Sequence, residues 1–253
     1  SNYAGGEIST RKYLIGLILY DLMGSKWDHG RLSREKVLDL CPQIRSEGLV
    51  SGLFYYDAVV DDARLVLRLI EEGKQLGGTA LNYARVTGLL RNLRHEVSGV
   101  AVQRADGSSQ EVIEIAASVV VNATGPWTDT LRGMLARNPV IRKQRGSHLV
   151  IDRAKLTLDR AITFNHPVDQ RTMFFIPWLG TTIVGTTDLD HPQEYEERYH
   201  EPFIDQQEFD YMMQAVHAVF PMAGVEIADI ISTYAGLRPI IRADSSSPSA
   251  QSR

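Results

Sequence analysis

Residues 119–127 read VVVNATGPW, and this stretch decides the fold that we expect. The β-branched run Ser118–Asn122 predicts a strand that is buried on both faces. The run ends in the small residues 123–125, where the backbone can approach a flat ligand closely because no bulky side chain intervenes. Pro126 then favours a helix that starts near Thr128. An ordinary strand–turn–helix connection and a ligand-binding turn both fit this pattern.

On the N-terminal side of this stretch, the hydrophobic pattern changes from helical to alternating. Asp61 is a good N-cap for a helix, and the two glycines at 77–78 end that helix. Three short strands are predicted next, at Thr79–Thr87, Val97–Arg104 and Val112–Ile115. We therefore expect a helix followed by a β-meander.

On the C-terminal side, β-branched and aromatic runs with brief connections predict an antiparallel sheet. The runs are Ile141–Ile151, Ala161–Phe164, Met173–Pro177 and Thr182–Thr187, with a last strand at Ile230–Tyr234. An amphipathic helix from Asp205 to Phe220 lies between them, and Asp205 and Glu208 have the spacing of a capping box. Residues 11–24 also have apolar residues at helical spacing. They predict a core helix, with a membrane-surface contact as the alternative.

The composition excludes several classes of protein. A formal net charge of −4 argues against a strongly basic nucleic-acid binder, and 43% hydrophobic residues argue against a disordered chain. The single cysteine, Cys41, cannot form an internal disulfide, which fits a reducing compartment. No apolar run reaches the roughly 18 residues of a membrane span. The first methionine is Met23 and the chain ends in a polar stretch, so we expect both ends to be cuts in a longer protein.

Two side chains outside the opening stretch are suited to chemistry. His148, within RKQRGSHLVI (142–151), is a candidate general base because its pKa lies near working pH, although a structural histidine is the alternative. Arg238 stands between a strand and a proline, a rigid position from which its guanidinium can hold phosphate or carboxylate. The acids and histidine of TTDLDH (186–191) are typical of a turn, and we expect no metal site there.

Seven short motifs occur in order along the chain. They are YDLMG (20–24), VDDARLV (60–66), VNATGPW (121–127), RGSHLVI (145–151), FFIPW (174–178), GTTD (185–188) and AGLRP (235–239). Together they resemble the FAD-dependent glycerol-3-phosphate dehydrogenases of the D-amino-acid-oxidase-like flavoprotein superfamily. The family's N-terminal GxGxxG segment and its later GGK-type segment are absent, so the resemblance implies the middle part of such an enzyme.

The resemblance also implies a mixed α+β fold, in which an antiparallel-sheet substrate domain is interleaved with part of a Rossmann-like FAD domain. It assigns 1–60 and 139–231 to substrate binding, and 61–138 and 232–253 to a partial FAD-binding domain. By the same resemblance His148 is the catalytic residue, and Arg238 and Arg253 bind the substrate. The residues expected to contact FAD are Val86, Ala123, Thr124 and Gly125.

The implied function is oxidation of sn-glycerol 3-phosphate, a phosphorylated polyol, to dihydroxyacetone phosphate. FAD is the implied cofactor and a quinone the electron acceptor. The implied location is the cytoplasm, with peripheral contact at the cytoplasmic membrane as an open alternative. No nucleic-acid partner is expected, and the sequence carries no signal for an oligomeric state.

Two other functions stay open. A related flavoenzyme could oxidise an amino acid or a 2-hydroxy acid through the same arginines, since a guanidinium also binds carboxylate. The chain could also be a non-catalytic fragment or binding module, because the pyrophosphate of FAD normally rests on the missing GxGxxG turn.

Overall fold

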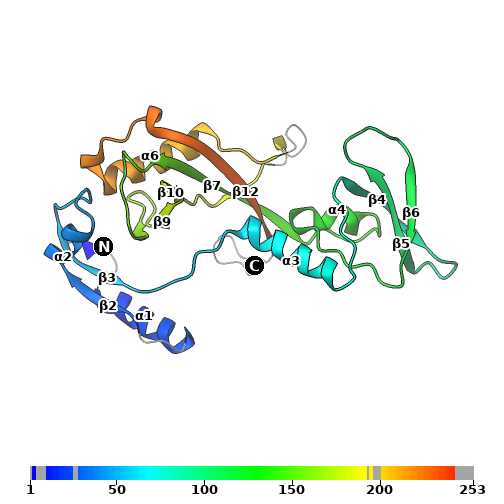
Figure 1. Cartoon of the computed structure of the whole chain (residues 1–253), viewed down its shortest axis with the longest axis horizontal. Helices are drawn as coiled ribbons and strands as arrows, with labels where there is room; N and C mark the ends of the chain where they lie inside the picture. The colour runs from blue at the N-terminus through cyan, green and yellow to red at the C-terminus, as the bar shows by residue number, and fades with distance from the viewer. Residues whose placement is uncertain (1, 4–9, 25–27, 193, 196–200, 243–253) are drawn as a thin grey trace. The chain divides into compact units, whose positions relative to one another are not determined.

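A computed structural model describes residues 2–3, 10–24, 28–192, 194–195 and 201–242 (Figure 1). The chain divides into two compact units. Unit 1 comprises residues 1–57, 143–238 and 243–253, and unit 2 comprises residues 58–142 and 239–242. Each unit is described by itself below. The assignment of substrate binding and FAD binding to separate domains stays a prediction.

Unit 1 is built on a six-stranded sheet. Its strands are β7 (Ile141–Asp152), β8 (Ile162–Asn165), β9 (Thr172–Trp178), β10 (Thr181–Gly185), β11 (Leu189–Asp190) and β12 (Ile230–Ile241). The order is β11–β7–β10–β9–β8, with β12 also paired to β7. The pairs β7–β10, β9–β10, β8–β9 and β7–β11 are antiparallel, which confirms the predicted kind of sheet. β12 continues past the predicted end of the last strand.

Helix α6 (Gln206–Val219) packs against this sheet. The predicted capping box is confirmed: the backbone N–H of Glu208 donates to the Asp205 side chain at 2.9 Å, and the N–H of Asp205 donates to the Glu208 carboxylate at 3.2 Å. Met212 and Val216 on its inner face belong to one apolar core with residues of β7 and β9. The 3₁₀ turns η2 (Pro221–Ala223) and η3 (Ile227–Asp229) lead from α6 to β12.

The N-terminal part of unit 1 is a smaller sheet with two helices. The sheet has the order β1–β3–β2 and consists of β1 (Asn2–Tyr3), β2 (Gly30–Ser33) and β3 (Leu49–Phe54). The Ser33 hydroxyl caps α2 (Arg34–Leu40) by accepting from the N–H of Lys36. Cys41 follows α2 and is buried.

Helix α1 (Thr10–Gly24) differs from the predicted core helix. Ile15 and Leu22 are each 58% exposed, so the prediction of a buried stripe was wrong. The apolar side chains of LIGLILY occur all around the helix, and therefore no single face of α1 marks its buried side. Among the residues that the structure describes, no helix has the length and apolar character needed to cross a membrane.

Unit 2 begins with α3 (Asp62–Gln75), and Asp61 is its N-cap as predicted. The predicted meander follows as β4 (Ala84–Arg91), β5 (Val97–Arg104) and β6 (Val112–Ala116), an antiparallel sheet in the order β4–β5–β6. The 3₁₀ turn η1 (Gly125–Trp127) and the short α4 (Thr128–Gly133) complete the unit. The sequence therefore predicted the elements of this unit with one exception, although the first strand begins at Ala84 instead of Thr79 and continues to Arg91.

The exception is the run Ser118–Asn122, which forms no strand. Val119 is 76% exposed and Val121 is 80% exposed, so the predicted burial on both faces was wrong. A strand exists only where a neighbour pairs with its backbone, and no described strand pairs with this run. Local bonds order its end instead: the Asn122 side chain accepts from the Thr124 hydroxyl at 2.8 Å and donates to the Thr128 carbonyl at 3.1 Å.

Candidate active site

The two faces of strand β7 carry different groups. Successive side chains of a strand point to opposite faces, so Arg145 and Ser147 share one face while Gly146 and His148 share the other. Arg145 and Ser147 contact Glu208 of α6. Gly146 and His148 instead contact side chains of β12. The candidate site therefore lies on the face of β7 that carries Gly146 and His148, and a buried polar network lies on the opposite face.

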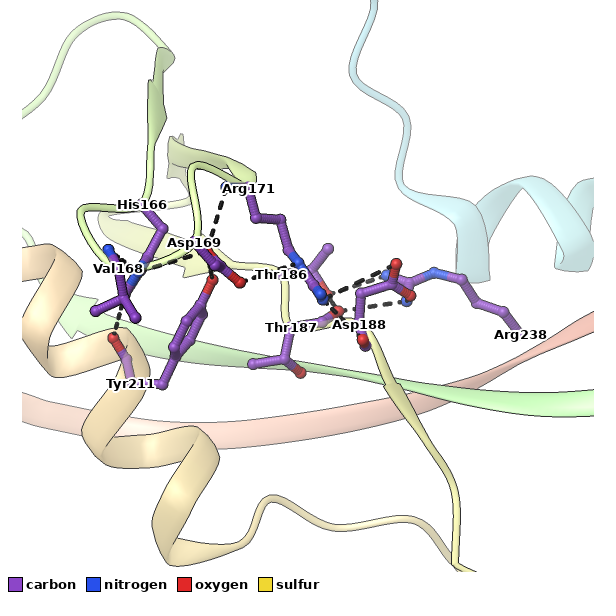
Figure 2. Close-up of polar contacts among 9 residues, drawn as sticks. All are labelled: His166, Val168, Asp169, Arg171, Thr186, Thr187, Asp188, Tyr211 and Arg238. Atoms are coloured by element: carbon purple, nitrogen blue, oxygen red, sulfur yellow. Dashed lines mark hydrogen bonds and ion pairs between the residues drawn. The ribbon is translucent and has the colours of Figure 1, made fainter. Parts of the chain in front are cut away.

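The guanidinium group of Arg238 lies directly over Gly146. A Cβ atom at Gly146 would come within 2.7 Å of Cζ of Arg238, so a side chain there would displace the guanidinium. Nη2 of Arg238 donates to the Thr186 hydroxyl at 3.0 Å, and Nη1 donates to the Thr187 carbonyl at 3.4 Å. Nη1 also lies 3.5 Å from Oδ1 of Asp188. The segment after β10 thus holds the arginine predicted to bind the substrate anion (Figure 2).

His148 lies two residues along β7 from Gly146. Its ring stacks on Tyr234 of β12, with centroids 4.6 Å apart and planes 9° apart. Gly185 is its register partner on β10, and a Cβ there would be 2.9 Å from Nε2 of His148. Burial, and secondly the charge of Arg238, lower the pKa of His148 to about 4. At pH 7 the imidazole is therefore neutral and able to accept a proton.

A buried network supports the site from behind. Both the Ser147 and the Thr187 hydroxyls donate to Oε1 of Glu208, at 2.9 and 2.6 Å. Nη2 of Arg145 lies 2.8 Å from Oε2 of Glu208 and also pairs with Asp205. Thr187 therefore links α6 to the Arg238 site, since its hydroxyl bonds to Glu208 and its carbonyl accepts from the arginine.

The residues expected to contact FAD lie in unit 2. Gly125 has a φ of +55°, a left-handed geometry that glycine adopts readily, and open space surrounds the position of a Cβ. Ala123 and Thr124 before it are exposed, so the backbone of this bend is accessible to a flat ligand. Val86 is half-buried on β4, which within the described residues pairs only with β5, so one backbone edge of β4 is open to a ligand.

A cavity of about 360 Å³ adjoins both of these segments. It is lined from β4 by Leu89 and from the other segment by Val120 and Asn122, with α4 contributing Leu131. An open bend, an open strand edge and a neighbouring apolar cavity fit the binding of a large, flat cofactor. Whether Val86, Ala123, Thr124 and Gly125 contact FAD stays a prediction.

The structure brings His148 and Arg238 together on neighbouring strands. Arg253, the second predicted anion ligand, lies outside the described residues. Tyr234 was not predicted as a site residue, although it lies four residues before Arg238 and so on the same face of one strand. The motif TTD (186–188) was predicted to be a turn and part of the family resemblance, and no role in the site was assigned to it. Among the described side chains, no three His, Cys, Asp or Glu residues gather in a group that could hold a metal ion.

Comparison with known proteins places this geometry among flavoproteins. The family described as FAD dependent oxidoreductase matches residues 12–251 of the chain. The aerobic glycerol-3-phosphate dehydrogenase of Staphylococcus haemolyticus is 34% identical over 256 aligned positions, covering 99% of this chain and 45% of the relative. The alpha-glycerophosphate oxidase of Enterococcus casseliflavus is 35% identical over 246 positions, covering 94% of this chain and 39% of the relative.

A solved structure agrees with these matches. The glycerol-3-phosphate dehydrogenase from Bacillus halodurans, solved in complex with FAD, is similar with a TM-score of 0.77 and 32% identity. The match covers 85% of this chain and 42% of that one. The chain thus spans less than half the length of these relatives.

Proposed function

Because the chain belongs to the family of FAD-dependent oxidoreductases, we propose that the full-length protein oxidises sn-glycerol 3-phosphate to dihydroxyacetone phosphate. One observation carries the proposal: Arg238 and His148 lie on paired strands, and each side chain lies where a glycine leaves room for it. Gly146 leaves room for Arg238, and Gly185 leaves room for His148. An anion-binding cation beside a neutral base suits a substrate with a phosphate at one carbon and a hydroxyl at the next. Two relatives with aligned identities of 34% and 35% bear names that refer to this substrate.

In this proposal, the chemistry that FAD would supply when bound is acceptance of a hydride from C2 of the substrate. The backbone around Val86 and the bend Ala123–Gly125 would hold the cofactor. Arg238, and by the family resemblance Arg253, would bind the phosphate and so fix the position of C2. The proton of the C2 hydroxyl passes to a ring nitrogen of His148 as the carbonyl forms.

Substrate binding would also improve His148 as a base. The positive charge of Arg238 is one of the two causes that lower the pKa of His148. A bound phosphate offsets that charge, so the pKa of His148 rises when the anion is in place. The base therefore becomes stronger only when a substrate is there to be deprotonated.

The finer parts of the proposal concern the electrons and the location. We propose that a quinone reoxidises the flavin and that the protein works in the cytoplasm with peripheral contact at the membrane. These parts rest on the family resemblance. A quinone-reductase assay with and without lipid vesicles tests them, and an acceptor specificity for dioxygen alone would contradict the quinone.

The phosphate role of Arg238 is tested by Arg238→Met in the full-length, FAD-loaded protein. We expect kcat/KM for glycerol 3-phosphate to fall roughly 100-fold, mainly through KM, because a charge-assisted anchor is lost. Arg242→Met is the matched control, since its exposed side chain lies four positions further along and bonds only to the Ile141 carbonyl among the described contacts. An unchanged KM in Arg238→Met would remove the phosphate role.

A carboxylate substrate is the second candidate, because the same guanidinium binds a carboxylate equally well. A panel of glycerol 3-phosphate, glycine and 2-hydroxy acids, assayed with one enzyme preparation, separates the two. Turnover of an amino or hydroxy acid without turnover of glycerol 3-phosphate would replace the first proposal.

A non-catalytic role for the 253-residue chain is tested by its colour. We expect the purified chain alone to lack flavin absorbance near 450 nm, and the full-length protein to show it. Yellow protein from the 253-residue chain would show that its own residues suffice to hold the cofactor.

A further inference from the structure

The carboxylate of Asp188 lies between two guanidinium groups. Its Oδ1 is 3.5 Å from Nη1 of Arg238, and its Oδ2 is 3.9 Å from Nη1 of Arg171. Nη1 of Arg171 also donates to the Asp188 carbonyl at 2.7 Å. Figure 2 shows the two arginines reaching the Thr186–Asp188 segment from opposite sides. The Asp188 side chain is only 11% exposed, so little water screens its charge.

This arrangement matters because Asp188 opposes the function proposed for Arg238. An anion that approaches Arg238 also meets the negative charge of Asp188, and the two charges nearly cancel. Arg171 supplies a second positive charge on the far side of Asp188, and Asp169 in turn pairs with Arg171. With Arg171 present these four groups sum to a net charge of about zero, and without it Arg238 would share the cluster with two carboxylates and a net charge of about −1. Arg171 also fixes the backbone of the segment that orients Arg238.

Arg171 is held in place by the β8–β9 connection. Its carbonyl accepts from the N–H of His166 at 2.8 Å, and its N–H donates to Oδ1 of Asp169 at 3.2 Å. Asp169 also pairs with the guanidinium, 3.6 Å from Nε, and lies on the other side of Arg171 from Asp188 (Figure 2). The Tyr211 hydroxyl of α6 donates to Asp169 at 2.9 Å.

The same connection is fixed to α6 through aromatic rings. The buried ring of His166 stacks on Tyr211 with centroids 3.6 Å apart, and its Nε2 donates to the Tyr211 carbonyl at 2.9 Å. Burial, and then the bond to Asp169, raise the pKa of Tyr211, so its hydroxyl remains a donor. Arg171 is thus anchored to a helix and does not depend on Arg238 for its position.

We propose that Arg171 is a positioning residue for the anion site: it holds the Thr186–Asp188 segment against Arg238 and offsets the charge of Asp188. The inference rests on the proposed function, because it assumes that an anionic substrate binds at Arg238. The shared chemistry is an anion at Arg238, whether that anion is a phosphate or a carboxylate.

The first test is Arg171→Met in the full-length, FAD-loaded protein. We expect KM for glycerol 3-phosphate to rise about ten-fold, the scale of one partly screened charge at close range, while kcat changes less than two-fold. Arg153→Met is the matched control, because it removes one cation from a surface pair with Asp159 in the same unit. A KM within two-fold of the wild type in Arg171→Met would overturn the proposal.

The second test is rescue by Asp188→Asn. In the Arg171→Met background this change removes the negative charge that Arg171 had offset, so we expect KM to return to within about three-fold of the wild type. A purely structural role would give the double variant a KM at least as high as that of Arg171→Met, and that result would refute the charge argument.

The third measurement separates this inference from the proposed function. Inorganic phosphate serves as an equilibrium probe, and its affinity is taken from the rise in Tm with phosphate concentration. We expect Arg171→Met to weaken phosphate binding and Arg153→Met to leave it unchanged. If the wild type fails to turn over glycerol 3-phosphate but the phosphate result holds, the proposed function falls and the role of Arg171 stands. Equal phosphate affinity in the wild type and Arg171→Met would refute that role alone.

Discussion

The two units contrast sharply in how they bury apolar side chains. Within the described residues, every buried hydrophobic side chain but one lies in unit 1, and the exception is Ile240. In unit 2, α3 has no buried residue, and Val66 and Leu67 on that helix are 54% and 64% exposed. Apart from the run Ser118–Asn122, both units nevertheless contain the helices and strands that local sequence rules predict.

The comparison shows that helices and strands can form as predicted in a unit whose apolar side chains are not packed into a core. The N-cap at Asp61 and the pairing of β4 with β5 need only neighbouring residues. A core needs apolar faces that meet, as Leu149, Phe175 and Val216 do in unit 1. Most helix stability in proteins comes from such packing, so unit 1 should carry most of the stability of the chain.

Among the variants that test this contrast, Phe175→Ala has the largest expected effect on stability. Phe175 is fully buried and packs on Phe164 and Phe220, with centroids 4.8 and 4.7 Å away. We expect the free energy of unfolding to fall by about 3–5 kcal/mol, because a large cavity is left in the core. Urea denaturation followed by tryptophan fluorescence measures it in a background with Trp27→Phe and Trp127→Phe, where Trp178 of unit 1 is the one tryptophan left in the sequence. A loss below 1 kcal/mol would break the comparison.

The second test asks whether the polar network behind the site adds to this stability. Glu208→Gln removes the charge that Arg145 meets in the interior, while the amide oxygen can still accept from Thr187. We expect a loss of about 2–3 kcal/mol in the free energy of unfolding. The control is Glu72→Gln on α3, whose exposed pair with Arg68 is expected to contribute less than about 0.5 kcal/mol. Equal losses in the two variants would refute the contrast.

The third test uses pH. His148 is uncharged in the folded state down to about pH 4, whereas an unfolded histidine takes up a proton near pH 6.5. The unfolded state therefore binds more protons between pH 6.5 and 4, and stability falls as pH is lowered through this window. We expect His148→Gln to retain about 1–2 kcal/mol of the stability that the wild type loses between pH 7 and pH 5.

The measurement is urea denaturation at both pH values. His95→Asn, which replaces an exposed histidine in a left-handed turn with a residue that tolerates that geometry, is the control. If His148→Gln and the wild type lose the same stability on acidification, His148 is not held neutral by its surroundings.

The smallest effect is expected in unit 2. Leu67→Ala truncates a side chain that is 64% exposed, and alanine is the best helix former, so the free energy of unfolding should change by less than about 0.5 kcal/mol. Urea denaturation measures the change, and far-UV circular dichroism follows the loss of helix. A loss above 2 kcal/mol would show that α3 packs in solution as the helices of unit 1 do.

The sequence predicted the parts of the fold that depend on neighbouring residues. The capping box of Asp205 and Glu208 and the β5 strand Val97–Arg104 are confirmed, and so is the family resemblance drawn from seven motifs. The run Ser118–Asn122 has the composition of a strand but lacks a paired neighbour, and composition alone does not report a neighbour. In the same way, α1 has apolar residues but no distinct buried face.

The candidate site shows the same limit. His148 and Arg238 were identified from the residues around them and from the family resemblance. The stacking of Tyr234 on His148 depends on how β12 pairs with β7, and the contact between Arg171 and Asp188 depends on a loop meeting a strand end. These contacts join residues that are far apart in the sequence, so the spacing of residues along one strand does not predict them.

The position of Cys41 has a practical consequence. It is the only thiol in the chain, its side chain is buried in unit 1, and burial raises its pKa. A thiol reagent can therefore react with it only after this part of the chain opens, and its labelling rate measures the frequency of that opening. The wild-type protein thus contains its own probe of local fluctuation, which reports on one unit without any engineered label.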